Sequence, residues 1–149
     1  MQIKEIYSKL HEFVVSATGL PDEKVIFANQ TSMVRPTKPF VTISVGSFKN
    51  IGTPIETRVN ATGEIATLIA MVFTASFQSY SDRPHAAEEI LSDLYAGIFT
   101  ELQPSIFKGI MAAGRTVKYV TAIPLPVNNQ MESRAILEIE FGFNKVTKY

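Results

Sequence analysis

Two neighbouring segments, residues 55–61 and 65–77, carry their apolar side chains at odd-numbered positions, and this alternation constrains the fold more than any other feature. Successive side chains of a β-strand point to opposite faces, so the pattern predicts two strands that each bury one face. Because only a short connection separates them, we expect the two strands to form a long antiparallel β-hairpin.

The register of this hairpin follows from the same alternation. If odd residues face odd residues, the numbers of paired residues must sum to an even value. A two-residue turn would pair Ala61 with Glu64 and bring a core position opposite a solvent position. A three-residue loop ending at Gly63 instead pairs Val59 with Ile65, and it places glycine where a left-handed residue is preferred. The sequence therefore predicts the three-residue loop.

Helical and strand patterns surround the hairpin on both sides. Apolar residues at three- and four-residue steps predict helices at 3–17, 84–102 and 104–113. Alternation and short apolar runs predict further strands at 25–28, 40–45, 116–123 and 131–145. This order predicts an α+β fold with a mainly antiparallel sheet, in which a long central β-hairpin packs against an amino-terminal helix and a middle helical pair. We expect residues 1–149 to form a single domain.

The composition excludes several classes of function. Of the 149 residues, 46% are hydrophobic and 19% are charged, which is enough apolar material for a core and excludes a disordered chain. The 14 basic and 14 acidic side chains cancel, which argues against gripping nucleic acid by bulk charge. The absence of cysteine excludes disulfides, a thiolate zinc site and a cysteine nucleophile. Low charge also favours association of the chain with copies of itself.

Few side chains are placed for chemistry. The sequence has no glycine-rich phosphate loop, no nucleophile elbow and only two histidines. His85 could share a helix face with Glu88 and Glu89, but this spacing is equally typical of a solvated acidic face, which we favour over a metal site. Glu138 and Glu140 lie on the polar side of a strand, where a general acid and base would stay solvated. We predict no catalytic, metal-binding or cofactor-binding residue and no enzymatic activity.

No segment suggests a membrane or secretory route. The most apolar stretch, at residues 65–75, is shorter than the roughly 18 residues that a spanning helix needs. The first residues lack the apolar run of a signal peptide. We therefore expect a protein that is made and kept in a cytoplasm, without a membrane partner.

Apolar residues at even positions suggest a contact surface on the second face of the sheet. Phe40 and Phe48 are expected on the even face of their strand, and Leu68 and Val72 occupy even positions of the long hairpin strand. A strand that is apolar on both faces is covered on both sides. Helices of the same chain or a neighbouring subunit could supply the second cover, and both readings stay open. The candidate interface residues are Arg35, Pro36, Phe40, Phe48, Ile51, Leu68 and Val72.

Two short motifs point to a family. The segments VIFANQ at residues 25–30 and RPTKPFVTI at residues 35–43 resemble the neck or tail terminator (tail completion) proteins of tailed bacteriophages. The order of an amino-terminal helix, a strand, a loop with two prolines, a hairpin, a helix and closing strands is also similar. The resemblance therefore extends over nearly the whole chain.

The resemblance implies a structural protein of the virion neck, assembled in the bacterial host cytoplasm and without a cofactor. Such terminators form a ring, usually of six subunits, at the head-proximal end of the tail tube. The ring ends tube polymerisation and offers a docking surface to the connector protein of the DNA-filled head, while DNA passes through its lumen without being read. For the ring contact we expect the even face of the hairpin on one side, and residues 35–36 with the loop at 46–54 on the other.

Two other functions remain open at this point. The chain could be a connector or stopper on the head side of the neck. It could also be a small cytoplasmic ligand-binding domain or enzyme that uses His85 and the nearby acidic residues.

Overall fold

The computed structural model of the chain describes residues 2–28, 36–58, 65–123, 125–127 and 130–148. Helices and strands combine in an α+β fold with a mostly antiparallel sheet, so the predicted fold class is confirmed. In chain order the elements are α1 (Gln2–Thr18), η1 (Asp22–Lys24), β1 (Val25–Phe27), β2 (Phe40–Val45), β3 (Lys49–Asn50), β4 (Ile55–Arg58), β5 (Ile65–Ser81), α2 (Ala86–Ile98), α3 (Leu102–Phe107), β6 (Ala112–Ala122), β7 (Leu125–Val127) and β8 (Gln130–Lys148).

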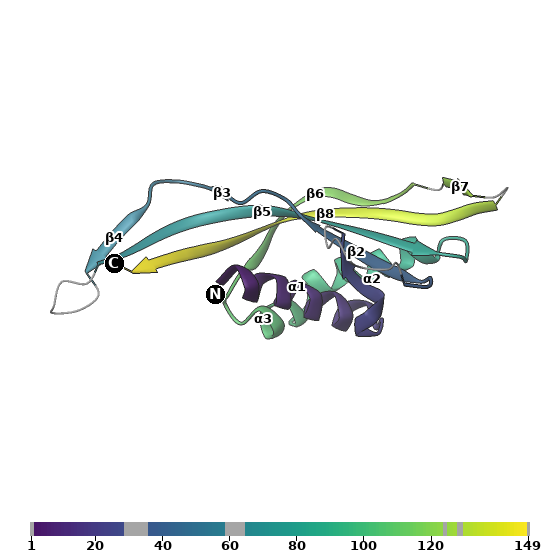
Figure 1. Cartoon of the computed structure of the whole chain (residues 1–149), viewed down its shortest axis with the longest axis horizontal. Coiled ribbons are helices and arrows are strands. Elements are labelled where there is room, and N and C mark those ends of the chain that lie inside the picture. The colour runs from purple at the N-terminus through teal and green to yellow at the C-terminus, as the bar shows by residue number, and fades with distance from the viewer. Residues whose placement is uncertain (1, 29–35, 59–64, 124, 128–129, 149) are drawn as a thin grey trace.

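Two long strands, β5 and β8, form the centre of the sheet (Figure 1). They pair without interruption over 16 residues of each, from Ala66 opposite Lys148 to Ser81 opposite Ser133. The sheet order is β1-β2-β5-β8-β6, and only β1 and β2 run parallel among the described pairs. β3 and β4 pair with β5 as well, so β2, β3 and β4 together follow the edge of β5 that β8 leaves free.

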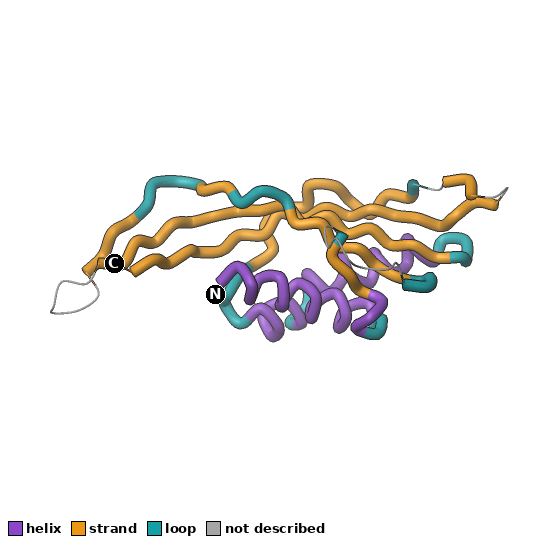
Figure 2. The backbone as a smooth tube through the Cα atoms, in the orientation of Figure 1, coloured by secondary structure: helices purple, strands orange, loops and turns teal. Residues whose placement is uncertain are grey.

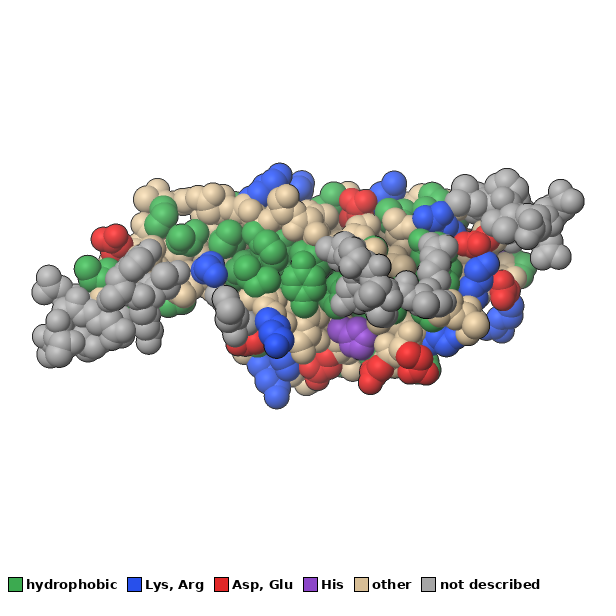
Figure 3. All heavy atoms as spheres, viewed as in Figure 1, with side chains coloured by type: hydrophobic (Ala, Val, Ile, Leu, Met, Phe, Trp, Pro, Cys, Tyr) green, Lys and Arg blue, Asp and Glu red, His purple; other side chains and the backbone are tan. Residues whose placement is uncertain are grey.

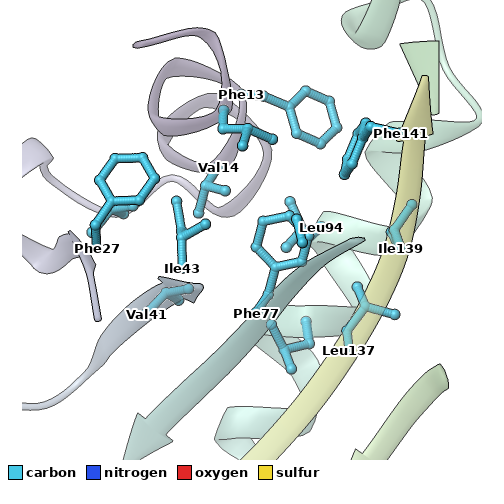
Figure 4. Packing of buried hydrophobic residues seen from close by; sticks show 14 of the residues in the cluster. Phe13, Val14, Phe27, Val41, Ile43, Phe77, Leu94, Leu137, Ile139 and Phe141 are labelled. Carbon is cyan, nitrogen blue, oxygen red and sulfur yellow. The ribbon is translucent and has the colours of Figure 1, made fainter. Parts of the chain in front are cut away.

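The described α-helices, α1, α2 and α3, lie on one side of this sheet (Figures 1 and 2). Odd positions of β5 and β8 face them, and Phe77 and Phe141 are fully buried there against Phe13 of α1 and Leu94 of α2 (Figure 4). The predicted inward face of both long strands is thus confirmed. No described helix covers the opposite side, which we call the outer face. The idea that helices of the same chain cover both faces is therefore wrong for the described part of the chain.

Several element boundaries differ from the prediction. α2 begins at Ala86 rather than at residue 84 and ends at Ile98 rather than at 102. The third helix, α3, is shorter than predicted, because Lys108 and Gly109 turn the chain with positive φ angles of 49° and 78°. Lys108 is the left-handed cap at which the helix ends, and Gly109, which adopts a positive φ without steric cost, continues the turn, so that β6 begins at Ala112.

The predicted hairpin register is wrong. Arg58 pairs with Ile65 and Ile55 pairs with Leu68, so the paired numbers sum to an odd value. The expected pair of Val59 and Ile65 is therefore not formed, and the loop residues 59–64 themselves lie outside the described residues. A buried face fixes register, but Ile55 is 58% exposed and Ile65 is 38% exposed. Burial therefore does not enforce the odd-to-odd pairing at this end of β5.

Phe48 lies on the opposite face from the one predicted. Between β2 and β5 the numbers of paired residues sum to an even value, as for Phe40 opposite Tyr80. Between β3 and β5 they sum to an odd value, as for Lys49 opposite Val72. One extra residue between the two strands inverts the side-chain faces. The Phe48 ring consequently packs on the helix side, with its centroid 5.2 Å from that of Phe73.

Candidate subunit interface

The sheet projects beyond the helices as an arm, which we define as β4 together with residues 65–70 of β5 and 144–148 of β8 (Figures 1 and 2). In the figures this arm extends past the amino-terminal end of α1. Its outer face is the continuation of the even face of β5. An apolar side chain on this face has no helix of its own chain to pack against among the described residues.

Four exposed apolar side chains gather on or beside the outer face of the arm. Ile55, Leu68 and Val146 lie in one row across β4, β5 and β8, because Leu68 pairs with both of the others. Their exposed fractions are 58%, 37% and 50%. Ile51 lies opposite Ala70, to whose carbonyl oxygen its N–H donates a hydrogen bond of 2.8 Å, and it is 53% exposed. We call these four residues the outer apolar row.

The structure brings three of the sequence-predicted interface residues together. Ile51 and Leu68 belong to the outer apolar row, and Val72 is half-buried on the same face, opposite Lys49. The predicted loop at 46–54 contains β3 and follows the edge of β5, so it forms one continuous surface with the even face of β5 and is not the separate second patch that we expected. Sequence reasoning missed Ile55 because it assigned this residue to the buried side of the hairpin.

Phe40 lies on the outer face as predicted, but at the end of β5 away from the arm. It is only 2% exposed and its ring stacks on that of Tyr80, with centroids 4.6 Å apart and planes inclined by 13°. The guanidinium carbon of Arg134 lies 4.8 Å from the Tyr80 ring centroid, and Arg134 donates a hydrogen bond of 2.8 Å to Gln78. Phe40 therefore packs within its own chain.

The loop before β2 is tied to the sheet by an ion pair. The Nζ atom of Lys38 lies 2.8 Å from Oε2 of Glu132 and 3.5 Å from Oδ1 of Asp82. The hydrogen bond to the Glu132 carboxylate raises the pKa of Lys38 above its usual value, against a smaller lowering by burial. Pro36 is half-buried in this loop, and Arg35 lies outside the described residues.

Apolar and charged side chains occupy different parts of the surface. Hydrophobic side chains follow the sheet between the arm and the helices, whereas charged side chains gather around the helices and along the rims (Figure 3). The outer face, which this view does not show in full, carries charged as well as apolar side chains, since Arg134, Glu138 and Glu140 occupy even positions of β8.

A comparison with known protein families identifies the family to which this chain belongs. The model of a family described as phage neck terminator protein matches residues 4–149. The chain belongs to the phage neck terminator family. A comparison with curated proteins gave no significant match. Membership confirms the resemblance drawn from residues 25–30 and 35–43, and it makes the chain a structural protein of the phage neck with its place in the virion.

Of the other side chains singled out for chemistry in this neck terminator, His85 is exposed, whereas Glu138 and Glu140 are half-buried. The His85 side chain is 83% exposed, and its Nδ1 atom lies 3.2 Å from Oε1 of Glu88. No group of three potential metal ligands occurs within the described ranges. Glu140 lies 3.6 Å from Arg115, and Glu138 pairs across strands with Lys118. Neither carboxylate is fully buried and each lies beside a basic residue of β6, which differs from a desolvated pair of carboxylates.

The described helices of the neck terminator do not meet the requirements for crossing a bilayer. None of them is both long enough and apolar enough to do so.

Proposed function

We propose that this neck terminator forms a ring at the head-proximal end of the phage tail tube, where it ends tube polymerisation and provides the docking surface for the head. The observation that carries the proposal is the arm, because its outer face exposes apolar side chains that no described helix covers. A structural protein of the neck has other proteins as its partners, and an uncovered apolar face is suited to such a partner.

A ring requires each subunit to use two different surfaces, since its contacts run head to tail. We propose the outer face of the arm as one of them, with Ile51, Leu68 and Val72 in the contact. Pro36 and Arg35 precede β2, whose first residue pairs with Tyr80 at the end of β5 away from the arm. We propose this end of the molecule for contact with the tail tube protein or the connector protein of the head.

A ring of six subunits would let DNA pass through its lumen without sequence recognition. The zero formal net charge supports this role, because each phosphate that a protein neutralises adds to its affinity for DNA. On the outer face, Glu138 and Glu140 lie beside Lys118 and Arg115, so acidic and basic groups alternate there. We propose that the chain has no catalytic activity and joins other proteins after synthesis in the host cytoplasm.

Purified tail tubes and DNA-filled heads distinguish the two sides of the neck. We expect the chain to co-purify with tail tubes from a phage that lacks heads. Recovery with filled heads but not with tubes would assign it to the head side, as a connector or stopper. The mass of the isolated protein in solution then tests the ring.

A further inference from the structure

A second group of exposed apolar side chains lies where the end of α2 meets the edge strand β6. Phe99 is 70% exposed, Tyr119 is 66% exposed and Val117 is 41% exposed. Tyr95 lies between the two rings, with its centroid 5.0 Å from that of Phe99 and 5.9 Å from that of Tyr119. We call Tyr95, Phe99, Val117 and Tyr119 the α2–β6 flank.

The flank is built on regular elements and its rings support one another. Tyr95 meets both neighbouring rings edge-on, and its hydroxyl accepts a hydrogen bond of 3.4 Å from the Thr116 hydroxyl. Exposed aromatic side chains with a polar tip bury a large area at low entropic cost, which is why tyrosine is enriched at the energetic centres of interfaces. These properties indicate a contact surface.

The arm of the same chain is too far away to cover the flank. Thr116 pairs with Ile139 of β8, whereas Leu68 of the outer apolar row pairs with Val146. Val146 and Ile139 are seven residues apart on one strand, a distance of about 24 Å at about 3.4 Å per residue. The chain therefore has two separate apolar surfaces, which is what a head-to-tail contact between copies requires.

The exposed area of the flank fits a substantial part of such a contact. Each aromatic side chain offers roughly 150–250 Å², so the exposed fractions of Phe99 and Tyr119 amount to on the order of 250 Å². A stable interface of standard size buries about 800 Å² on each partner. The two rings alone would supply about a third of this area, and β-branched and leucine side chains of the arm would pack on their faces.

We propose that the α2–β6 flank is the second ring contact and receives the outer apolar row of the neighbouring copy's arm. The inference rests on the proposed ring. A ring could also form through other surfaces, so the flank contact and the ring are separate claims. It makes the partner at this surface a second copy of the chain.

Cysteine cross-linking tests this contact directly, because the natural chain contains no cysteine. Single cysteines are combined in pairs, one in the arm (Ile55→Cys, Leu68→Cys or Val146→Cys) and one in the flank (Phe99→Cys or Tyr119→Cys). A disulfide needs Cα atoms about 4.4–6.8 Å apart, so these pairs cannot close within one copy. We expect at least one pair to give a ladder of covalent multimers that collapses to monomer on reduction.

The matched control combines Leu68→Cys with Glu5→Cys, an exposed position on α1. The inference is overturned if every arm–flank pair links copies no better than this control. A second test uses Phe99→Ser with Tyr119→Ser, which should lower the ring fraction at least tenfold while the far-ultraviolet circular dichroism stays that of the natural chain.

The two proposals fail in different ways. If the double serine variant forms rings like the natural chain, the flank inference fails and the ring remains. If the natural chain shows no association between copies, either alone or on tail tubes, the ring itself fails.

Discussion

Ile55 lies directly opposite Leu68 on the neighbouring strand, and both side chains are exposed on the face of the sheet that is turned away from the helices. This pairing decides what the arm presents to a partner. With the register expected from simple alternation, Ile55 would face the helix side. In the observed register it extends the apolar surface of Leu68 and Val146 across three strands.

Placing a charge in the middle of this row should prevent copies from associating while leaving the fold intact. For Leu68→Glu we expect the affinity between copies to fall at least about tenfold, since 1.4 kcal/mol corresponds to a factor of ten and burial of an unpaired charge costs more. The free energy of unfolding should change by only about 0.5 kcal/mol, as is typical of surface positions. Native mass spectrometry and urea denaturation measure the two effects.

Ile3→Glu is the matched control, because Ile3 on α1 is 38% exposed and Leu68 is 37% exposed. It should leave the ring unchanged. Val72→Glu tests the half-buried centre of the same face. Unchanged rings in electron micrographs of both the Leu68→Glu and the Val72→Glu variant would remove the outer face from the proposed interface.

Local periodicity was sufficient to predict the helix-facing side of the sheet. Phe73 and Phe77 are 1% and 0% exposed, as their odd positions indicate. The stripe of apolar residues at three- and four-residue steps likewise predicts the buried face of α1, where Ile6 and Leu10 are fully buried. These features depend on neighbours in sequence, so they can be read without knowing the tertiary structure.

The parts that escaped prediction depend on contacts between distant segments. One extra residue between β2 and β3 turns Phe48 to the helix side, and nothing in the local sequence shows where the shift occurs. The α2–β6 flank contains Phe99 and Tyr119, which are 20 residues apart in sequence, and Tyr119 reaches Tyr95 only because β6 packs beside α2. None of its residues was among the interface residues expected from the sequence.

The aromatic core under the sheet should dominate stability. Phe141 is fully buried, and its ring contacts those of Phe73, Phe77 and Phe107 at centroid distances of 5.6, 6.4 and 5.9 Å. We expect Phe141→Ala to lower the free energy of unfolding by about 3–5 kcal/mol, because it removes buried apolar surface and leaves a cavity. Urea denaturation of the dilute protein gives the value.

Phe99→Ala provides the comparison, since Phe99 is the same residue type at 70% exposure. It should change the free energy of unfolding by only about 0.5 kcal/mol. Equal losses in the two variants would contradict the assignment of Phe141 to the core.

A side chain at Gly46 should destabilise the point where the edge of the sheet shifts register. Its N–H donates a hydrogen bond of 2.8 Å to the carbonyl oxygen of Thr74, and a Cβ atom at Gly46 would lie 3.1 Å from that oxygen. We expect Gly46→Ala to cost about 1 kcal/mol, because the added Cβ atom would crowd the Thr74 carbonyl oxygen and the backbone would have to shift to relieve the contact. Thermal or urea denaturation measures the loss.

Gly142→Ala is the control for this substitution. A Cβ atom there would meet its nearest neighbour, the Met71 carbonyl oxygen, at 3.7 Å, which is an ordinary contact. This variant should therefore be no less stable than the natural chain, because alanine reduces the entropy of the unfolded state. A larger loss at Gly142 than at Gly46 would refute the steric argument.

The ion pair of Lys38 with Glu132 should give a stability contribution that disappears only in strong alkali. The pKa of Lys38 is raised above 10.5 in the folded protein, chiefly by the hydrogen bond to Glu132. A group whose pKa rises on folding stabilises the protein fully below its unfolded pKa and loses that contribution as the pH rises through the folded pKa. The stability advantage of the natural chain over Lys38→Met should thus stay constant from neutral pH to near 10.5 and shrink above it.

Urea denaturation over a pH series measures this difference, with Lys4→Met, an exposed lysine on α1, as the control for unspecific alkaline effects. An advantage that is already lost near neutral pH would show that the ion pair does not hold the loop before β2 to the sheet.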